Sequence, residues 1–262
     1  MKKRLDIYLV EHNLAPSRQK AQRIIMSGCV YVDNCKTDKS GFLVTDNSVV
    51  DVRADESKYV SRGGQKLEKA MQFFDIDITN CVCMDVGAST GGFTDCMLQN
   101  GAEKVYSVDV GYGQLAWQLR NDKRVVNLER QNIRYLTSQE VAEKLDFVSI
   151  DVSFISLKLV LPVVYNMMQN NATAVALIKP QFEAGREKVG KNGVVKDADT
   201  HIEVIVKVFG FTRDIGFNIY GLTYSPIKGP KGNIEYLMHI GKSSNDNTVD
   251  IKEVVDLAHR EC

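Results

Sequence analysis

The sequence predicts an α/β protein with a doubly wound, Rossmann-like, mostly parallel sheet, preceded by a small α+β domain. From residue 61 onward, apolar segments of strand length alternate with amphipathic segments of helix length. This alternation is typical of a parallel sheet whose two faces are covered by helices. The first apolar strand ends in a glycine-rich turn at residues 85–93. The first sixty residues hold only short helical and strand-like segments, which indicates a separate small domain.

The composition limits the classes of protein to which the chain can belong. With 262 residues and 44% hydrophobic content, it can bury one large core and a smaller one. The formal net charge is zero, so any binding to nucleic acid requires a local basic patch. Residues 1–36 contain seven Lys or Arg and three acidic residues, a local charge of +4 that the rest of the chain balances. This asymmetry favours an amino-terminal end that faces RNA or a membrane.

The six cysteines show no Cys-x-x-Cys spacing. They are expected to be reduced, buried residues of a cytosolic protein, and no metal site is expected. No continuous apolar stretch follows the basic residues 2–4, and no segment approaches the ~18 apolar residues of a membrane-spanning helix. The sequence therefore predicts a soluble, cytoplasmic protein that does not contact a membrane.

Two helices and a small sheet are expected in an amino-terminal domain at residues 1–54. A first helix is predicted by apolar residues at helical spacing, and a second at residues 18–27, because Ser17 is a favourable N-cap. Lys20 and Arg23 project from the side of the second helix opposite its apolar stripe. The apolar residues of the first helix are Leu5, Leu9 and Val10, and strands are expected at residues 29–32, 42–44 and 49–52.

This domain resembles the RNA-binding module first described in a small-subunit ribosomal protein, the S-four domain. The matching stretches are residues 4–6, 17–21 and 25–32. The resemblance implies that basic side chains here contact RNA phosphates, which position RNA without reading its sequence. A solvated charged helix face is the alternative for each of them. The residues concerned are Arg4, Arg18, Lys20 and Arg23.

A polar run without periodicity predicts an interdomain linker at residues 55–60. The second domain is expected at residues 61–242, followed by a polar tail at 243–262 with a short helix at 249–258. Within the second domain, strands are expected at residues 81–87, 105–110, 125–128, 147–151, 174–179, 219–224 and 234–240. Helices are expected at residues 64–74, 90–100, 115–120, 139–145, 157–168 and 200–209.

The glycine-rich turn indicates a cofactor that contains a nucleoside. Gly87 ends the first strand, and Gly91 and Gly92 are expected to let the backbone approach a ligand closely. The spacing differs from the dinucleotide pattern G-x-G-x-x-G, which argues against NAD. The phosphate-binding lysine that ATP or GTP would require is missing after the turn. Asp109, at the end of the next strand, can accept both ribose hydroxyls; a tight turn without a ligand is the alternative.

Four charged residues are expected to converge near this turn. Lys66 lies at a helix start, and Asp151, Lys179 and Glu235 lie at strand ends. Ligands of such sheets bind beyond the carboxyl ends of the strands. Two lysines and two carboxylates beside a nucleoside site predict group transfer to a weakly acidic hydroxyl. Lys179 is the candidate base: a second ammonium and burial favour its neutral form, the carboxylates oppose it, and the sequence leaves this balance open.

Each member of this set also has a purely structural alternative. Lys66 could be a solvated lysine at a helix start, and Glu235 could point to solvent from an edge strand. Asp151 and Lys179 end buried strands, where isolated charges are uncommon. The functional interpretation therefore depends on all four lying together.

The glycine turn and residues 107–109 resemble the S-adenosylmethionine loop of the FtsJ-like RNA methyltransferases. With the amino-terminal module in front, residues 3–242 are similar to the TlyA family of rRNA cytidine-2′-O-methyltransferases, also known as hemolysin A. The resemblance implies a class I methyltransferase domain, S-adenosylmethionine as cofactor and ribosomal RNA or ribosomal subunits as partner. It assigns Lys66, Asp151, Lys179 and Glu235 to the family's catalytic tetrad. It assigns the cofactor to Asp85, Gly87, Ser89, Thr90 and Gly91 (methionine part), Asp109 (ribose) and Asn132 (adenine).

Two loops complete the predicted site. Residues 180–196 form a long segment after the candidate base, and residues 225–232 could form a second wall. Arg186, Lys188 and Lys191 are expected to grip the RNA backbone, with a solvated loop as the alternative. A membrane-damaging hemolysin and a non-catalytic RNA-binding or ribosome-assembly factor remain the rival functions, and the sequence sets no oligomeric state.

Overall fold

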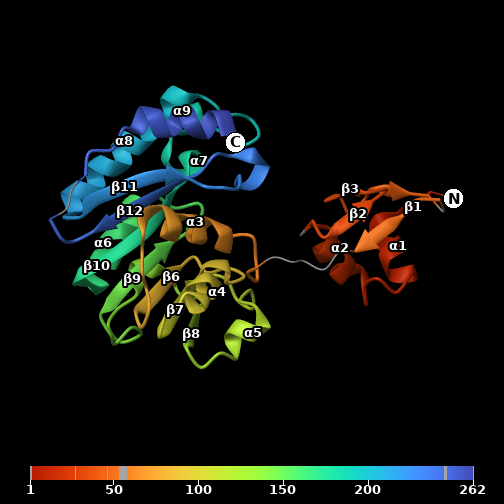
Figure 1. Ribbon diagram of the computed structural model, residues 1–262, viewed down its shortest axis with the longest axis horizontal. Coiled ribbons are helices and arrows are strands. Elements are labelled where there is room, and N and C mark those ends of the chain that lie inside the picture. Colours follow the sequence, from red (N-terminus) through yellow and green to blue (C-terminus); the bar gives the residue numbers. More distant parts are fainter. Residues whose placement is uncertain (1, 27, 46, 53–57, 245–246, 262) are drawn as a thin grey trace. The chain divides into compact units, whose positions relative to one another are not determined.

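The computed structural model describes residues 2–26, 28–45, 47–52, 58–244 and 247–261. The chain forms two compact units, Met1–Lys58 and Tyr59–Cys262 (Figure 1). Residues 55–57 of the predicted linker lie outside the described residues.

The first unit has a core between two helices and short strands. The helices are α1 (Leu5–Glu11) and α2 (Arg18–Met26), and the hydroxyl of Ser17 accepts a hydrogen bond from the backbone N–H of Lys20, as an N-cap does. Leu5, Leu9, Ala21 and Ile25 bury the facing helix sides. These helices and the predicted strands are confirmed. The strands are β1 (Lys3–Arg4), β2 (Val30–Val32), β3 (Cys35–Lys36), β4 (Leu43–Val44) and β5 (Val50–Val52); β1 pairs with β4, and the other sheet has the order β3-β2-β5.

The second unit contains a seven-stranded sheet with the order β11-β12-β10-β9-β6-β7-β8. Strand β12 is antiparallel to both of its neighbours, and the pairs from β10 to β8 are parallel. The predicted doubly wound, mostly parallel sheet is therefore confirmed. The strands are β6 (Val82–Val86), β7 (Lys104–Asp109), β8 (Val125–Glu129), β9 (Leu145–Ile150), β10 (Met168–Ile178), β11 (Asn218–Tyr224) and β12 (Tyr236–Gly241).

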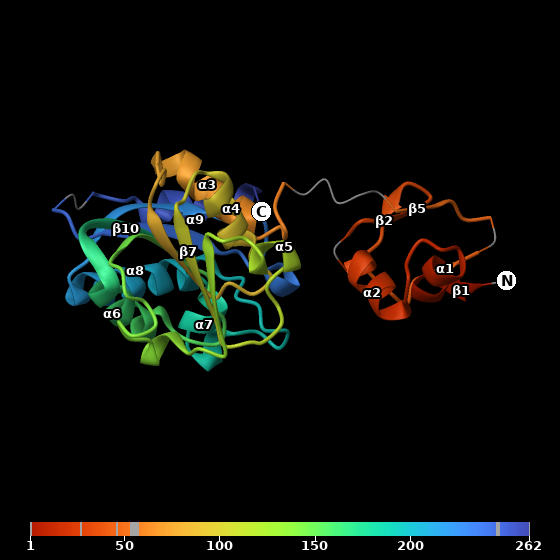
Figure 2. The same ribbon diagram turned by 90° about the horizontal axis from the view of Figure 1, so that it is seen from below.

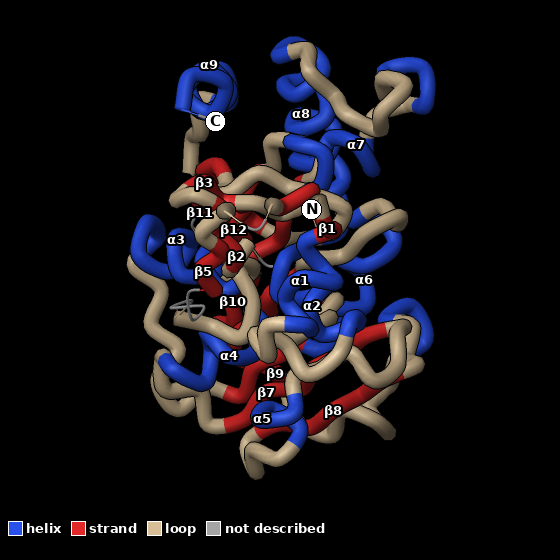
Figure 3. The backbone as a smooth tube through the Cα atoms, turned by 90° about the vertical axis from the view of Figure 1, so that its right-hand side faces the viewer, coloured by secondary structure: helices blue, strands red, loops and turns tan. Residues whose placement is uncertain are grey.

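Helices cover both faces of this sheet. Figures 2 and 3 show α3 and α4 on one side of the strands and α6 on the other. One core layer packs α3 and α4 on the sheet through residues such as Leu67 and Met97, and the other packs α6 and α8 through residues such as Val160 and Ile205. The four helices are α3 (Gly64–Phe74), α4 (Gly92–Gln99), α6 (Leu157–Met167) and α8 (Ala198–Ile215). A further helix is α9 (Ile251–Glu261), and the shorter elements are α5 (Trp117–Arg120), α7 (Pro180–Glu183), η1 (Ile133–Tyr135), η2 (Arg186–Lys188) and η3 (Pro230–Gly232).

Two sequence expectations about elements are wrong. The predicted helix at residues 139–145 does not form: a single turn follows Thr137, whose N–H and hydroxyl bond to Glu140, and Leu145 already belongs to β9. The segment after Lys179 is not one open loop, because it begins with α7 and continues into η2. Among the described residues, no helix is long and apolar enough to cross a membrane.

The strand directions bring distant residues to one edge of the sheet. Strands β6, β7, β9 and β10 run in parallel, so their carboxyl ends share an edge. Because β12 is reversed, its first residues rather than its last lie at the same edge. Lys179 directly follows β10, Asp151 follows β9, and Glu235 precedes β12.

Candidate functional site

Lys66 on the first turn of α3 meets two carboxylates. Its Nζ lies 2.6 Å from Oε2 of Glu235 and 3.7 Å from Oδ2 of Asp151. Gln181 donates a hydrogen bond to the other oxygen of Glu235 at 3.3 Å. Glu235 is 1% exposed and Lys66 8%, so this ion pair is buried and each charge requires the other.

Lys179 completes the cluster from the end of β10. Its Nζ lies 2.5 Å from Oδ1 of Asp151 and donates a hydrogen bond to the hydroxyl of Ser153 at 3.1 Å. Asp151 thus bridges both lysines through its two oxygens. Its side chain is 21% exposed, more than either lysine, so the cluster opens to solvent on the Asp151 side. The structure brings all four predicted residues, hereafter the charged tetrad, into one connected network.

Two residues beside the tetrad carry features that sequence reasoning did not single out. Ser153 orients the Lys179 amine, as described above. Phe154 is 90% exposed and has a positive φ of 63°, a backbone conformation that bulky residues rarely adopt. Its ring packs at a tilted angle against Phe182, with 4.8 Å between ring centroids. The signal for both was available, because they lie two and three residues after Asp151 in the sequence.

The glycine-rich turn lies in close contact with neighbouring segments of the protein. A Cβ at Gly91 would clash with Leu119 of α5, and one at Gly92 would clash with Ser61. A Cβ at Gly87, whose φ is +89°, would lie 2.5 Å from the carbonyl oxygen of Asp151. These glycines therefore let protein segments pack closely, and Gly87 and Gly92 also line a small cavity beside Asp151. Gly87 in particular lets the turn touch the backbone of the tetrad.

Asp85 is fully buried under the turn. One carboxylate oxygen accepts hydrogen bonds from the N–H and the hydroxyl of Thr94 at 2.9 and 2.7 Å, and the other accepts one from Ser149 at 3.3 Å. Burial raises the pKa of Asp85 to about 7, although the hydrogen bonds from Thr94 oppose the shift. Its side chain thus fixes the first turn of α4 in the position that shapes the loop.

Asp109 at the end of β7 is held by backbone groups. One oxygen accepts a hydrogen bond from the N–H of Ser89 and the other from the N–H of Gly111, both at 2.7 Å. A carboxylate oxygen can accept a second hydrogen bond. Asp109 can therefore bind two ligand hydroxyls while it keeps both backbone partners.

A cavity of about 710 Å³ is lined by residues of the glycine-rich turn, by Asp109 and by Asp151. Its volume lies within the usual range for small-molecule sites. It has apolar walls, such as Val108 and Ile133, and polar groups at Asp109, Asn132 and Asp151. A neighbouring cavity of about 150 Å³ is lined by Thr90 and shares Gly87, Ser89 and Asp151 with the larger one.

Asn132 begins the short helix η1 on the far side of this cavity. Its side-chain oxygen accepts a hydrogen bond from the N–H of Arg134 at 3.1 Å and so caps the helix. The cap fixes the amide at the cavity wall. Among the described residues, no group of three His, Cys, Asp or Glu could hold a metal ion.

The basic residues of the first unit fall into two groups. Arg4 and Arg18 both bond to the buried Asp6, through their Nε atoms at 3.0 Å. The hydrogen bond from Arg4 holds the pKa of Asp6 well below its usual range, although burial opposes it. Arg4 also donates a hydrogen bond from Nη2 to the other Asp6 oxygen at 3.1 Å, and the two arginine side chains remain 44% and 57% exposed. Lys20 and Arg23 are exposed on α2.

The three basic residues expected to hold RNA after Lys179 also differ from one another. Arg186 and Lys188 lie on η2, and Lys188 forms an ion pair with Glu203 of α8. Lys191 lies beyond η2, is exposed and lines a separate cavity with Lys188.

Comparison with known proteins identifies the family. The FtsJ-like methyltransferase family matches residues 59–242, and the S4 domain matches residues 3–50. The chain is 46% identical to YqxC of Bacillus subtilis over 266 residues, 99% of this chain and 95% of YqxC. It is 42% identical to the 16S/23S rRNA (cytidine-2′-O)-methyltransferase TlyA of Mycobacterium tuberculosis over 258 residues, 98% of this chain and 96% of TlyA.

A solved structure from Streptococcus thermophilus that carries the name hemolysin superposes with a TM-score of 0.79 at 44% identity, covering 99% of this chain and 96% of that one. The relatives thus span both units, in the same order along the chain. The chain therefore belongs to the FtsJ-like methyltransferases with an amino-terminal S4 domain, the family that includes TlyA.

Proposed function

We propose that this protein transfers the methyl group of S-adenosylmethionine to a ribose 2′-hydroxyl, that of a cytidine, in ribosomal RNA. The observation that carries the proposal is the charged tetrad: Lys66, Asp151, Lys179 and Glu235 form one network, and Asp151 also lines the cavity beside the glycine turn. The TlyA relative, which acts on cytidine 2′-hydroxyls by its name, supports the choice of substrate.

The cavity beside Asp109 fits a nucleoside cofactor. Asp109 keeps a free acceptor site on each oxygen for the two ribose hydroxyls, and Asn132 offers an amide for the adenine. Ser89, Thr90 and Gly87 line the smaller cavity, where the methionine part would bind. Asp85 and Gly91 would contribute indirectly, because the hydrogen bonds of Asp85 and the close packing at Gly91 hold the turn in place. S-adenosylmethionine, when bound, supplies a sulfonium methyl that is already activated for transfer.

The tetrad has the groups that are needed to remove a proton from a weakly acidic hydroxyl and to stabilise the resulting charge. In this mechanism Lys179 is the general base, which accepts the 2′-hydroxyl proton as the oxygen gains the methyl group. The Asp151 carboxylate, 2.5 Å away, stabilises the ammonium that results. Lys66, which pairs with Glu235 at 2.6 Å and lies 3.7 Å from Asp151, would stabilise negative charge that develops on the hydroxyl.

The rest of the substrate would be held by the amino-terminal domain and by residues around the tetrad. Arg4, Arg18, Lys20 and Arg23 present exposed cationic groups for RNA phosphates. Phe154, exposed next to Asp151, offers a flat apolar ring on which a base can stack. Arg186 adds a further cation after Lys179.

The direct test is transfer of a tritiated methyl group from S-adenosylmethionine to ribosomal subunits from a strain that lacks this protein. Mass-spectrometric mapping of 2′-O-methyl sites, in rRNA from cells with and without the protein, then identifies the nucleotide. Incorporation that wild type gives and Lys179→Met does not would support the proposal. Absence of any site that depends on the protein would contradict it.

Membrane lysis is the second candidate, because a solved relative carries the name hemolysin. A lysis assay with erythrocytes separates the two functions. Equal lysis by wild type and by Lys179→Met would show an activity independent of the tetrad.

A further inference from the structure

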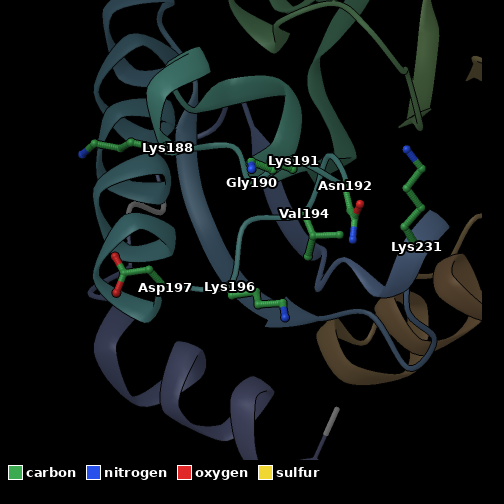
Figure 4. A pocket seen from close by; sticks show the side chains of 8 residues that line it. All are labelled: Lys188, Gly190, Lys191, Asn192, Val194, Lys196, Asp197 and Lys231. Atoms are coloured by element: carbon green, nitrogen blue, oxygen red, sulfur yellow. The ribbon is translucent and has the colours of Figure 1, made fainter.

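A second cavity, distinct from the one at the glycine turn, has lysines as four of its eight lining residues. Its volume is about 760 Å³, and Figure 4 shows its lining side chains. They come from the segment after η2 and from the loop before β12. The lining residues are Lys188, Gly190, Lys191, Asn192, Val194, Lys196, Asp197 and Lys231.

The only acidic side chain in this lining is committed elsewhere. Asp197 caps α8, where its carboxylate accepts hydrogen bonds from the N–H and the hydroxyl of Thr200 at 2.9 and 2.7 Å. Lys188 pairs with Glu203, also on α8. Figure 4 shows both side chains extending toward α8, while Lys196 and Lys231 extend to the other side. No acidic side chain of the lining therefore neutralises the charge of the lysines that face the cavity.

Three lysines keep their charge available. Lys191, Lys196 and Lys231 are exposed, and within the described part of the chain no ion pair engages them. Lys231 has a positive φ of 60°, a left-handed backbone conformation that residues other than glycine rarely adopt.

The two lysine-bearing segments are fixed to each other. The buried Asn233 accepts a hydrogen bond from the N–H of Val195 at 3.2 Å and donates to the carbonyl oxygens of Gly193 and Pro230, both at 3.0 Å. His201 bonds to the carbonyl oxygen of Val195 at 3.0 Å. The cavity thus has a preformed wall, which reduces the entropy lost when a ligand binds.

The same loop touches the charged tetrad. Gly229 packs so closely on the Glu235 carboxylate that a Cβ there would clash with it. Consecutive Cα atoms are about 3.8 Å apart, so the Lys231 Cα lies within about 8 Å of the Gly229 Cα. A chain of phosphates that leaves the tetrad in this direction would pass the lysines.

We propose that this lysine pocket binds the phosphodiester backbone of the RNA strand next to the nucleotide that enters the tetrad. The inference rests on the proposed function, and it assigns Lys191, Lys196 and Lys231 to the catalytic domain's own RNA contact. The lysine ammonium groups would bind the phosphates of the RNA strand. Such contacts position the strand but do not depend on its sequence.

The test compares two triple variants of the full chain that lose the same charge. Lys191→Gln, Lys196→Gln and Lys231→Asn are combined in the pocket variant; asparagine is chosen because it tolerates the left-handed backbone. Lys123→Gln, Lys144→Gln and Lys252→Gln, none of which lines this cavity, form the control. Binding of a labelled single-stranded 20-nucleotide RNA is measured over a range of salt concentrations. Each lost phosphate contact lowers the slope of log affinity against log salt by about 0.7.

We expect the slope of the pocket variant to fall by about 2 and that of the control to stay within about 0.5 of wild type. In methyl transfer to unmethylated subunits, KM for RNA should rise about tenfold or more while kcat stays within about twofold. The reason is that the lost contacts bind the RNA equally in the ground state and in the transition state. Equal slopes for the pocket variant and wild type, or equal falls in both variants, would overturn the inference.

Two further outcomes separate this inference from the proposed function. A pocket variant that binds free RNA normally but fails on intact subunits would indicate a protein partner and would also overturn it. Wild-type protein that transfers no methyl group would contradict the proposed function. The salt dependence of RNA affinity would still show whether the pocket binds RNA.

Discussion

The side-chain amine of Lys179 lies 2.5 Å from Oδ1 of Asp151, and this contact joins the ends of the neighbouring strands β10 and β9. The second oxygen of Asp151 faces Lys66 at 3.7 Å. One carboxylate therefore connects the candidate base to the buried pair of Lys66 and Glu235.

Replacement of Lys179 by methionine should remove catalysis and leave the fold intact. The amine is the only proton acceptor that the proposed mechanism uses, and general-base catalysis contributes roughly 10²–10⁴-fold to a rate. Asp151 keeps Lys66 as a partner, so no buried charge is isolated. Tritiated methyl transfer should fall by at least about a hundredfold. Lys123→Met, on the surface, is the control and should keep full activity; a Lys179→Met enzyme with comparable turnover would reject the assignment.

Glu235→Leu should destabilise the protein by about 3 kcal/mol, because it removes the closest counter-charge of the buried Lys66 ammonium and leaves only Asp151 at 3.7 Å. The double variant Lys66→Met, Glu235→Leu removes both charges and should recover most of that stability. Urea denaturation measures both, and neither variant should transfer methyl groups. If the double variant were as unstable as the single one, packing rather than charge compensation would explain the effect.

Asp109→Ala should weaken cofactor binding. The carboxylate offers charge-assisted hydrogen bonds to two ribose hydroxyls, each worth about 1.5–3 kcal/mol. Titration calorimetry with S-adenosylmethionine should therefore show a loss of at least about tenfold. Asp122→Ala, at a surface aspartate paired with Arg124, serves as the matched control. Unchanged affinity of Asp109→Ala for S-adenosylmethionine would show that Asp109 does not bind the ribose.

Phe154→Ala should impair RNA methylation without changing affinity for S-adenosylmethionine. The ring is 90% exposed beside the tetrad, and a stacked base is worth about 1–3 kcal/mol. We expect kcat/KM for rRNA to fall about tenfold or more. Phe154→Tyr preserves the ring and should restore the activity, which distinguishes stacking from a general disturbance of the loop. Equal activity of the alanine and tyrosine variants would contradict a stacking role.

His239 should make the fold sensitive to acid. Burial lowers its pKa to about 4, and within the described residues its Nε2 has no hydrogen-bond partner. An unfolded histidine has a pKa of about 6.5, so the unfolded state binds more protons between pH 4 and 6.5. Stability therefore falls as pH decreases through this window, by about 3 kcal/mol at its lower end.

The comparison of wild type with His239→Phe isolates this contribution, since Phe74 and Tyr220 already surround the site with aromatic rings. Urea denaturation between pH 4 and 7 should show a shallower pH dependence for the variant. His12→Phe, at an exposed position, should keep the wild-type slope. Parallel curves for wild type and His239→Phe would show that His239 does not titrate differently on folding.

The sequence was sufficient to predict the convergence of Asp151 and Lys179. Both directly follow apolar strands, and the carboxyl ends of parallel strands share one edge of a sheet. Glu235 reached the same edge for a reason that the pattern did not reveal. It precedes β12, which runs antiparallel, and hydrophobic alternation carries no information on strand direction.

The roles of small residues were harder to predict than those of charged ones. A glycine pattern indicates that something lies close to the backbone, but not what it is. At Gly91 and Gly92 it is the protein itself. The helix expected at residues 139–145 does not form, and the last of these residues, Leu145, is the first residue of β9 and pairs with Met168.

The order of the strands has a consequence for how the protein matures. β12 is the last strand of the large sheet along the chain, yet it lies between β10 and β11 rather than at a border. During synthesis its neighbours leave the ribosome first, and the sheet closes only when β12 inserts between them. Because Glu235 arrives with β12, the ammonium of Lys66 gains its closest counter-charge at that late step. A partly synthesised chain thus has no complete tetrad, and completion of the sheet is what makes the enzyme competent.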